Sequence, residues 1–367
     1  MFDNHSSSRS LKALVNHRWA KTKLGATFVA VGLVAALTTS SLSAGASATV
    51  RPPLTHQGAL GSERFNSSYI LPGGKSLAGK TFVLAFGVAP GQPFDVPLIN
   101  GAKAAAALLG VNLDITYGGG EDATTVSNFA TSVAQHVAGI AAQVLDTAEN
   151  KVLCEAYKAN IPVIAVNDSG ETGPAQNCVL AFVGQDFVSA GAALANYMVT
   201  QGLIKPGASG FCPVEFAADA YAVQRYQGVM QVLSKIHATC SLLSTGTDLA
   251  TAKSDMIEYM LGHRSTAFIL ALGGTPLQET PAVLASLKTH IPAGGFDLSD
   301  PVLQAIQNGT IAAAVDQQPY SQGFYGIMQL GLYVKYDLFP SSMGTGGTGL
   351  ITKSNIGVVL GLVPTYR

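Results

Sequence analysis

Charged residues are scarce in this chain, because only 12% of its 367 residues are Asp, Glu, Lys or Arg. Hydrophobic residues make up 48% and there are 40 glycines, a composition typical of globular domains with a large core and unlike that of disordered chains. The length suits two domains. Five basic residues but only one acid, Asp3, lie in the first 48 residues, so the remainder carries a charge of about −5. This acidity argues against a nucleic-acid partner, because nucleic acids are bound by basic surfaces.

The common catalytic and cofactor motifs are also missing. The sequence has no G-x-S-x-G, no H-E-x-x-H, no C-x-x-C and no H-x-x-x-H, and Gly118-Gly119-Gly120 lacks the spacing of a dinucleotide-binding loop. Residues 74–81 match the P-loop pattern, but they precede an apolar strand, whereas a P-loop must follow one. We therefore expect that the protein is not an enzyme and that it binds no cofactor and no metal ion.

There is only one long apolar run, Leu24–Leu37, and it is shorter than the roughly 20 residues of a membrane-spanning helix. Basic residues precede it and Ala46-Ser47-Ala48 follows, so we predict a secretory signal peptide over residues 1–48, cleaved near Ala48. An uncleaved membrane anchor is the alternative. The only tryptophan, Trp19, lies in this segment.

Cysteine is limited to Cys154, Cys178, Cys212 and Cys240. An even number in an exported protein suggests disulfides. Four cysteines allow three pairings, and we favour Cys154–Cys178 and Cys212–Cys240 because each closes a short loop. Buried free thiols are the alternative interpretation.

Residues 49–79 show no periodicity and are predicted to form a flexible leader, after which short apolar runs alternate with helical stretches. A helix is predicted over 95–109, where Ile99, Ala102 and Ala106 have helical spacing. Strands are predicted over 81–88, 111–117, 139–145, 161–166, 179–183, 210–214, 239–243, 267–272, 291–296 and 311–315. Strands that alternate with helices form parallel sheets, so the fold class is α/β.

A sequence pattern that occurs twice, called the internal echo below, suggests two similar lobes. Residues 158–162 (Lys-Ala-Asn-Ile-Pro) lead through a strand to Asn167-Asp168, and residues 288–292 (Lys-Thr-His-Ile-Pro) lead through a strand to Asp297. Counted from the proline, Asn167 and Asp297 hold the same place. Two lobes that each offer a polar strand tip to a shared cleft would explain the echo, and chance similarity is the alternative.

Polar side chains directly follow several of the predicted strands, which is where ligands bind in open α/β sheets. Asp297 and Gln317 follow the last two strands. After the first strand, Gln92 is placed to bond hydroxyl groups, Phe94 to stack on a sugar ring, and Asp95 to begin a helix. Arg225, near a helix start, offers a fork of donors to oxygen atoms. The alternatives are that Phe94 is a core residue, Asp95 only a cap and Arg225 a surface ion-pair partner.

Four segments together resemble the periplasmic sugar-binding proteins of ABC importers, of the ribose-binding type with the type I two-lobed fold. They are Gln92-Pro93-Phe94, residues 183–186 (Val-Gly-Gln-Asp), Arg225-x-x-Gly228, and Gly295-Phe296-Asp297 with residues 316–320 (Asp-Gln-Gln-Pro-Tyr). The resemblance covers about residues 80–367. It implies two similar lobes, each a parallel sheet flanked by helices, and three crossings between them, near residues 184–186, 317–319 and 352–355.

The resemblance also implies the site and its role. Its sugar contacts carry over onto Gln92, Phe94, Asn167, Arg225, Asp297 and Gln317. Asp168 stands where the ribose binders place an Arg, and Asp95 where they have a second Phe, so we add both to the expected ligand-binding set. These departures point away from D-ribose, toward another pentose, a polyol, a deoxy or furanose compound, or an amine-bearing sugar.

We therefore expect a monomeric, periplasmic protein that captures a monosaccharide or polyol and delivers it to an ABC permease. The expected lobes are residues 80–185 with 319–352, and 186–318 with 353–367. A periplasmic sensor that presents a sugar-like signal to a receptor is the alternative. A secreted glycosidase, using Asp168 and Asp297 as a carboxylate pair, is a further one.

Overall fold

The computed structural model describes residues 73–92, 94–170, 178–347 and 349–367. The predicted signal peptide and residues 49–72 of the predicted leader lie outside the described residues. Within the leader's described end, Leu77 is buried, and the Lys75 backbone N–H donates to the Lys335 carbonyl at 2.7 Å. Among the helices that the structure describes, none is both long and apolar enough to cross a membrane.

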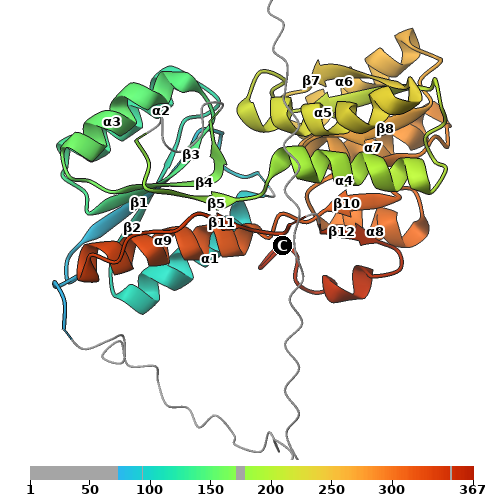
Figure 1. Ribbon diagram of the computed structural model, residues 1–367. Coiled ribbons are helices and arrows are strands. Elements are labelled where there is room, and N and C mark those ends of the chain that lie inside the picture. The colour runs from blue at the N-terminus through green and yellow to red at the C-terminus, as the bar shows by residue number, and fades with distance from the viewer. Residues whose placement is uncertain (1–72, 93, 171–177, 348) are drawn as a thin grey trace, which may run out of the picture. The chain divides into compact units, whose positions relative to one another are not determined.

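The described chain forms two six-stranded sheets with matching strand order (Figure 1). The first sheet runs β11-β5-β4-β3-β1-β2 and the second β12-β10-β9-β8-β6-β7. The first comprises β1 (Thr81–Phe86), β2 (Asn112–Tyr117), β3 (Gly139–Val144), β4 (Val163–Ser169), β5 (Ala181–Gly184) and β11 (Met343–Gly344). The second comprises β6 (Ser209–Val214), β7 (Thr239–Ser244), β8 (Phe268–Ala271), β9 (Ala293–Phe296), β10 (Ala313–Val315) and β12 (Leu350–Thr352). All pairings are parallel except that of β12 with β10, so the predicted α/β class is confirmed.

Helices cover both faces of each sheet (Figure 1). On the first sheet, α1 (Asp95–Leu109) and α9 (Pro319–Tyr336) cover one face, and α2 (Asp122–Ala134) and α3 (Asn150–Lys158) the other. On the second sheet, α4 (Phe187–Thr200) and α5 (Ala220–Leu233) lie opposite α6 (Leu249–Gly262), α7 (Gly274–Leu287) and α8 (Asp300–Asn308). The described residues also form the short 3₁₀ helices η2 (Thr147–Glu149), η3 (Ser234–Ile236) and η4 (Ile356–Val358). Each sheet therefore has buried hydrophobic residues on both faces, as parallel sheets require.

One helix pair in each lobe packs through glycines. In α4 and α5, a Cβ on Gly228 would lie 2.0 Å from the Val188 carbonyl oxygen, and one on Gly191 would lie 2.2 Å from that of Arg225. The pair α1 and α9 repeats this arrangement at Gly101 and Gly323. The Arg225-x-x-Gly228 signature thus has a packing cause, because Gly228 lets α5 approach α4 at the turn that carries Arg225.

The chain passes between the sheets three times. It leaves the first sheet after β5 to form α4, and leaves the second after β10 to form α9. The third crossing lies between Gly344 and Leu350, and our prediction of residues 352–355 was wrong, because β12 pairs with β10 in the second sheet. Residues 350–352 therefore belong to the second lobe and not, as predicted, to the first. For the remaining lobe boundaries we keep the predicted residues as a proposal.

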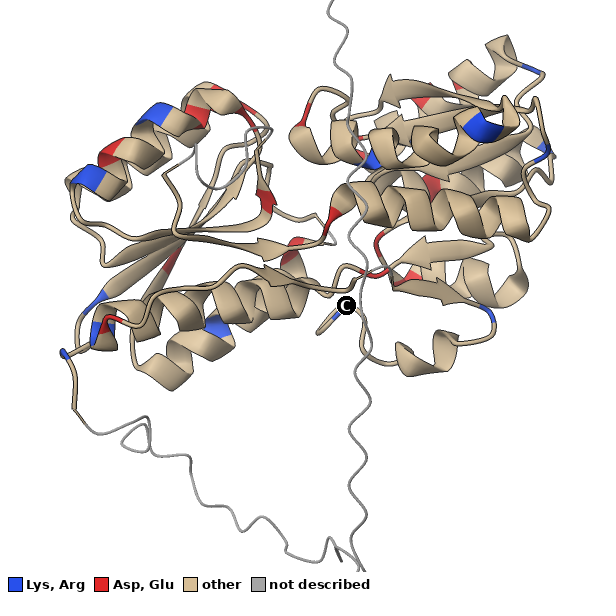
Figure 2. Ribbon diagram, viewed as in Figure 1, with Lys and Arg blue, Asp and Glu red and all other residues tan. Residues whose placement is uncertain are grey.

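Charged residues are sparse along the ribbon, as the composition requires (Figure 2). Acidic residues occur at several of the strand ends and crossings, whereas helix α3 carries residues of both signs (Figure 2).

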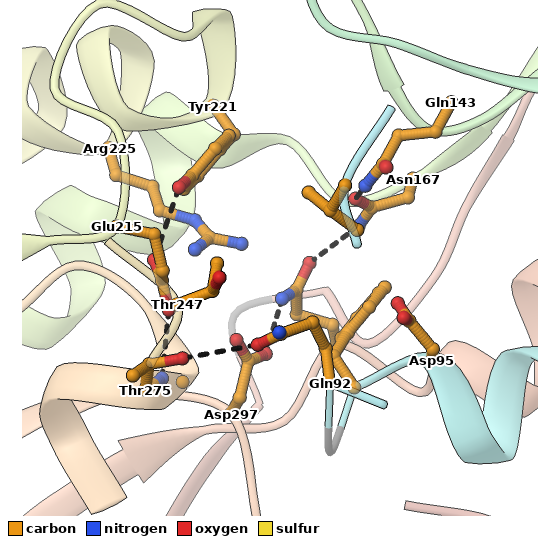
Figure 3. Close-up of a pocket in the computed structure, with 14 residues that line it drawn as sticks. Gln92, Asp95, Gln143, Asn167, Glu215, Tyr221, Arg225, Thr247, Thr275 and Asp297 are labelled. Atoms are coloured by element: carbon orange, nitrogen blue, oxygen red, sulfur yellow. Dashed lines mark hydrogen bonds between the residues drawn. The ribbon is translucent and has the colours of Figure 1, made fainter. Parts of the chain in front are cut away.

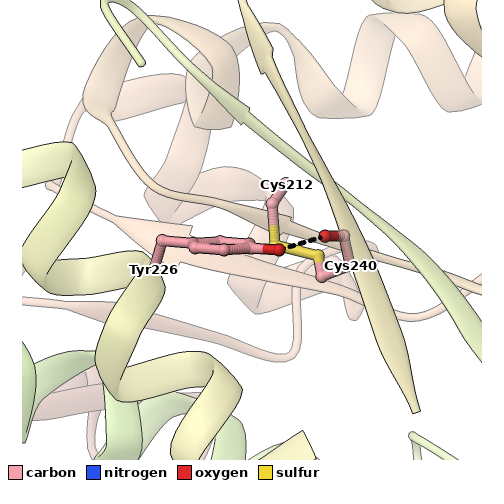
Figure 4. Close-up of a disulfide and its surroundings, with 3 residues drawn as sticks. All are labelled: Cys212, Tyr226 and Cys240. Atoms are coloured by element: carbon pink, nitrogen blue, oxygen red, sulfur yellow. Dashed lines mark hydrogen bonds between the residues drawn. A yellow bond between two sulfur atoms is a disulfide. The ribbon is translucent and has the colours of Figure 1, made fainter. Parts of the chain in front are cut away.

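Both predicted disulfides are confirmed. Cys154 in α3 is bonded to Cys178, and Cys212 in β6 is bonded to Cys240 in β7, with Cα–Cα separations of 4.9 and 5.7 Å. The second bond lies within the core of its sheet, and the Tyr226 hydroxyl donates to the Cys240 carbonyl at 2.9 Å beside it (Figure 4).

Candidate functional site

A polar pocket lies where the carboxyl ends of strands from both sheets meet (Figure 3). About 540 Å³ of empty space, part of it open to solvent, lies among its walls. Its lining comes from loops after β1, β6, β7, β9 and β10, from strands β3 and β4, and from the first turns of α1, α5 and α7. The lining residues are Val88, Gln92, Phe94, Asp95, Gln143, Asn167, Glu215, Tyr221, Arg225, Thr247, Gly274, Thr275, Asp297 and Gln317.

The structure brings most of the predicted site residues together. The pocket is lined by Gln92, Phe94, Asp95, Asn167, Arg225, Asp297 and Gln317. Asp168 lies outside this lining, because neighbouring residues of a strand point to opposite faces and Asn167 takes the pocket side. The Asp168 carboxylate is buried and accepts a hydrogen bond from the Gly170 backbone N–H at 3.1 Å. Its predicted ligand contact therefore has no support from the pocket lining.

Side-chain amides form a directed chain of hydrogen bonds across the pocket. The Gly87 backbone N–H donates to Gln143 Oε1 at 3.3 Å, and Gln143 Nε2 donates to Asn167 Oδ1 at 2.8 Å. Asn167 Nδ2 donates to Gln317 Oε1 at 3.2 Å, and Gln317 Nε2 donates to Asp297 Oδ1. Because every amide uses its oxygen and one N–H in the chain, the orientation of each is fixed.

Asn167 and Asp297 both have left-handed backbone conformations, with φ of +65° and +75°. Among non-glycine residues, Asn and Asp adopt this region most readily, and such conformations cluster at functional sites. The turn at each strand end aims the short polar side chain into the pocket. The residue types of the internal echo thus have a backbone cause as well as a chemical one.

Arg225 is held by aromatic rings rather than by an ion pair. Its guanidinium carbon lies 4.2 Å from the centre of the Phe296 ring, 4.7 Å from that of Phe187 and 5.0 Å from that of Tyr221. Nη1 donates to the Leu272 carbonyl at 2.6 Å, whereas the buried Nε has no partner among the described residues. A preoriented guanidinium with an unused donor suits a ligand oxygen.

Glu215 is a lining residue that our sequence prediction missed. It accepts from the Thr275 backbone N–H at 2.8 Å and from the Tyr221 hydroxyl at 3.1 Å, so it ties the end of β6 to the first turn of α7. Gly273 makes room for it, because a Cβ there would lie 1.7 Å from a carboxylate oxygen. An acid directly after the strand predicted over 210–214 was the signal that could have found it.

Gln143, Tyr221, Thr247 and Thr275 were missed as well. Gln143 is the penultimate residue of β3 and falls within the strand predicted over 139–145, and Tyr221 lies one helical turn before Arg225. Thr275 donates from its hydroxyl to Gln92 Oε1 at 3.3 Å, joining the loop after β1 to α7. Phe94 both lines the pocket and packs against the core of the first sheet, and its stacking on a sugar ring stays a prediction.

Burial dominates the electrostatics of the site. Burial raises the pKa of Asp95 to about 7, opposed only by the hydrogen bond to the Gln92 backbone. Burial also raises the pKa of Asp297 and of Glu215, and the positive charge of Arg225 acts in the opposite direction on both. The pocket thus contains three carboxyl groups for one guanidinium.

Two matching sheets with one polar pocket at their carboxyl edges have the architecture of type I periplasmic binding proteins, as predicted. The family model described as "Periplasmic binding protein domain" matches residues 83–336. The chain belongs to this family.

Several known proteins are similar to this chain. The xylose/arabinose-binding protein XylF of Sulfolobus acidocaldarius is 28% identical over 282 residues, which cover 72% of this chain and 69% of that protein. The solved structure of a periplasmic sugar-binding protein of an ABC sugar transporter from Legionella pneumophila is 26% identical, with a TM-score of 0.67 over 72% of this chain and 98% of that one. A carbohydrate transporter from Acidothermus cellulolyticus, solved with myo-inositol, has a TM-score of 0.71 at 23% identity, covering 78% and 99%. At that identity the last likeness establishes the fold alone.

Proposed function

We propose that this protein is the solute-binding component of an ABC importer, which captures a monosaccharide or polyol in the pocket and presents it to a membrane permease. The observation that carries the proposal is the pocket lining, in which fixed carboxamides, carboxylates and one arginine surround a space that also exposes an aromatic ring. Polyhydroxylated rings offer both donors and acceptors, so a wall of preoriented polar groups recognises them. The names of the relatives, which include a xylose/arabinose binder and a complex with myo-inositol, support this ligand class.

The proposed binding step follows from the chemistry of the walls. Arg225 Nε donates to a ligand oxygen, the carboxylates accept from ligand hydroxyls, and Phe94 covers an apolar face of the ring. Residues from both sheets line the pocket, so a ligand that satisfies both sets favours closure of one lobe on the other. Buried groups left unpaired by a poorer ligand penalise it, which provides specificity.

A thermal-melt screen of the chain without residues 1–48 tests the proposal against pentoses, hexoses, inositols and other polyols. The readout is a dye or circular dichroism, because the only tryptophan lies in the removed segment. A ligand at 100 times its Kd stabilises the fold by about 2.7 kcal/mol, which raises the Tm by several degrees. Absence of a dose-dependent shift with every neutral sugar and polyol contradicts the proposal.

The variant Asp297→Asn tests the placement of the site. Asn tolerates the left-handed backbone of this position, so the fold is retained while the charged acceptor is lost. We expect affinity for the identified ligand to fall by about 10- to 100-fold. Asp300→Asn is the matched control, because Asp300 lies three residues away and is exposed at the start of α8. Equal affinity of the wild type and Asp297→Asn would place the ligand elsewhere.

The same proposal includes export, with removal of residues 1–48, and a monomeric state. Mass spectrometry of the secreted protein tests the cleavage near Ala48, and light scattering tests the monomer. Stimulation of ATP hydrolysis by the cognate importer in vesicles, when the liganded protein is added, tests the permease partner. A retained N-terminal segment or an unresponsive importer would contradict the corresponding part.

A further inference from the structure

Among the three carboxyl groups that line the pocket, only Asp95 has a buried oxygen without a hydrogen-bond partner in the described residues. Only 2% of the residue is exposed, and its Oδ2 atom is buried and forms no hydrogen bond there. The described part of the chain places no Lys, Arg or His within ion-pair distance of it. A buried carboxylate oxygen without a donor carries a desolvation cost, so Oδ2 is suited to accept a hydrogen bond from a ligand.

The other two carboxylates of the lining are occupied. Glu215 accepts from a backbone N–H and a tyrosine hydroxyl, and Asp297 accepts from Gln317. The positive charge of Arg225 also acts to lower the pKa of Glu215 and of Asp297, whereas it does not contribute to the pKa shift of Asp95. The pocket is therefore polarised, with the cationic donor Arg225 on one side and the unpartnered Oδ2 of Asp95 on the other. In the view of Figure 3, Arg225 and Asp95 lie on opposite sides of the residues that cross the pocket.

Capping of helix α1 does not account for Asp95. The residue that precedes the helix is Phe94, which provides no side-chain hydrogen bond, and Asp95 itself donates its backbone N–H to the Gln92 carbonyl at 3.0 Å. A negative charge in the first turn of a helix is favourable, but that benefit is available to an exposed side chain and requires no burial. The carboxylate instead lies in the pocket wall beside Phe94.

We propose that Asp95 is a specificity-determining residue that accepts hydrogen bonds from adjacent hydroxyls of the ligand, so that the site selects neutral polyhydroxylated ligands with a free hydroxyl pair remote from the group bound by Arg225. This inference rests on the proposed function. Two carboxylate oxygens match two adjacent hydroxyl donors, as a single amide oxygen cannot. We expect sugar acids and sugar phosphates to bind poorly, because the pocket contains three carboxyl groups for one guanidinium.

A double-mutant cycle, in which one change is made in Asp95 and the other in the ligand, tests the inference. Once a neutral ligand is identified, calorimetry measures its Kd and those of its monodeoxy analogues with the wild type and with Asp95→Leu. We expect Asp95→Leu to weaken the parent ligand by about 10- to 100-fold. Removing the ligand hydroxyl that Asp95 binds should lower the affinity of the wild type by a similar factor. The same removal should lower the affinity of Asp95→Leu by less than about threefold, because the variant already lacks that interaction.

Two further variants complete the test. Asp95→Asn, which keeps the size of the side chain, should show an intermediate loss and gives the same test if Asp95→Leu fails to fold. Asp300→Asn, the exposed acid at the start of α8, should bind like the wild type. If the wild type binds a sugar, but each deoxy analogue loses the same factor in affinity with the wild type and with every variant, this inference is overturned while the proposed function stands. If the wild type binds no sugar or polyol, the proposed function itself fails.

Discussion

Asn167 and Asp297 hold equivalent positions in the two sheets, and Gln317 is hydrogen-bonded to both. Each residue lies near the carboxyl end of its strand, β4 or β9, and these strands occupy the same place in the two strand orders. Both have a positive φ. Gln317 accepts from the Asn167 amide and donates to the Asp297 carboxylate, so one side chain at a crossing joins the polar tips of both lobes.

Replacing Gln317 by Leu should damage both binding and stability. The leucine removes the acceptor of the buried Asn167 Nδ2 and the donor to Asp297 Oδ1. Such losses cost about 1–3 kcal/mol for each group. We expect the free energy of unfolding in urea to fall by about 2 kcal/mol or more and the ligand affinity to fall at least tenfold. Gln307→Leu, on the exposed face of α8, is the control, and equal losses in the two variants would contradict a bridging role.

The order of strands and helices was predictable from the sequence because buried strands leave a direct hydrophobic signal. The helix predicted over 95–109 is α1 with the same bounds, and every predicted strand from 81–88 to 311–315 is present. The two strands that sequence patterns missed, β11 and β12, have two and three residues, which is too short for a period. The third crossing was misplaced for that reason.

The site was predictable only where a polar residue ends a strand. Asn167, Asp297 and Gln317 have this signal, and all three line the pocket. Gln143 lies within a buried strand, and Thr275 lies in the first turn of α7 in the other lobe. Their place in the pocket lining therefore depends on tertiary structure and has no local sequence signal. Asp168 was included because it stands where the ribose binders place an Arg, but strand alternation points its side chain away from the pocket.

The protein should become less stable as the pH rises from 5.5 to 8.5. Burial raises the pKa of Glu149 to about 9 and that of Asp95, Asp168 and Asp219 to about 7. Between the ordinary carboxyl pKa near 4 and these values, the folded state holds protons that the unfolded state releases. The free energy of unfolding therefore falls with rising pH across this window. Urea unfolding at pH 5.5, 7.0 and 8.5 measures it.

Glu149→Gln identifies the largest contributor. Glu149 is buried and its Oε2 has no partner among the described residues, so a neutral amide removes the cost of ionisation at high pH. We expect the variant to gain stability over the wild type at pH 8.5 and to differ much less at pH 5.5. Glu155→Gln, exposed on α3, should show no such difference. A gain for Glu149→Gln that is the same at both pH values would contradict the assignment.

The two disulfides should differ in their accessibility to reductant. Cys212 and Cys240 are buried in the core beneath α5, whereas Cys154 and Cys178 are only partly buried. Brief treatment of the folded protein with dithiothreitol, followed by alkylation and mass spectrometry, should label Cys154 and Cys178 first. Replacing Cys212 and Cys240 together by Ala should cost about 2–4 kcal/mol of unfolding free energy. Earlier labelling of Cys212 and Cys240 would contradict the protection seen in the core.

Gly228→Ala should weaken ligand binding from a position outside the pocket. Its new Cβ would lie 2.0 Å from the Val188 carbonyl oxygen, and this contact is backbone, which cannot turn away. Helix α5 must move away from α4, and Arg225, one turn earlier, moves with it. We expect a loss of about 1–3 kcal/mol in unfolding free energy and a loss of affinity beyond what the residual unfolding explains.

Gly262→Ala is the matched control for this prediction. Gly262 is also the glycine of a helix, at the end of α6, but nothing lies within 4 Å of a Cβ placed there. Alanine is a better helix former than glycine, so this variant should be at least as stable as the wild type and should bind normally. The two variants differ by the same single methyl group from the wild type. If both lose affinity, or if Gly228→Ala is destabilised without any loss of affinity, the glycine contact between α4 and α5 does not position Arg225.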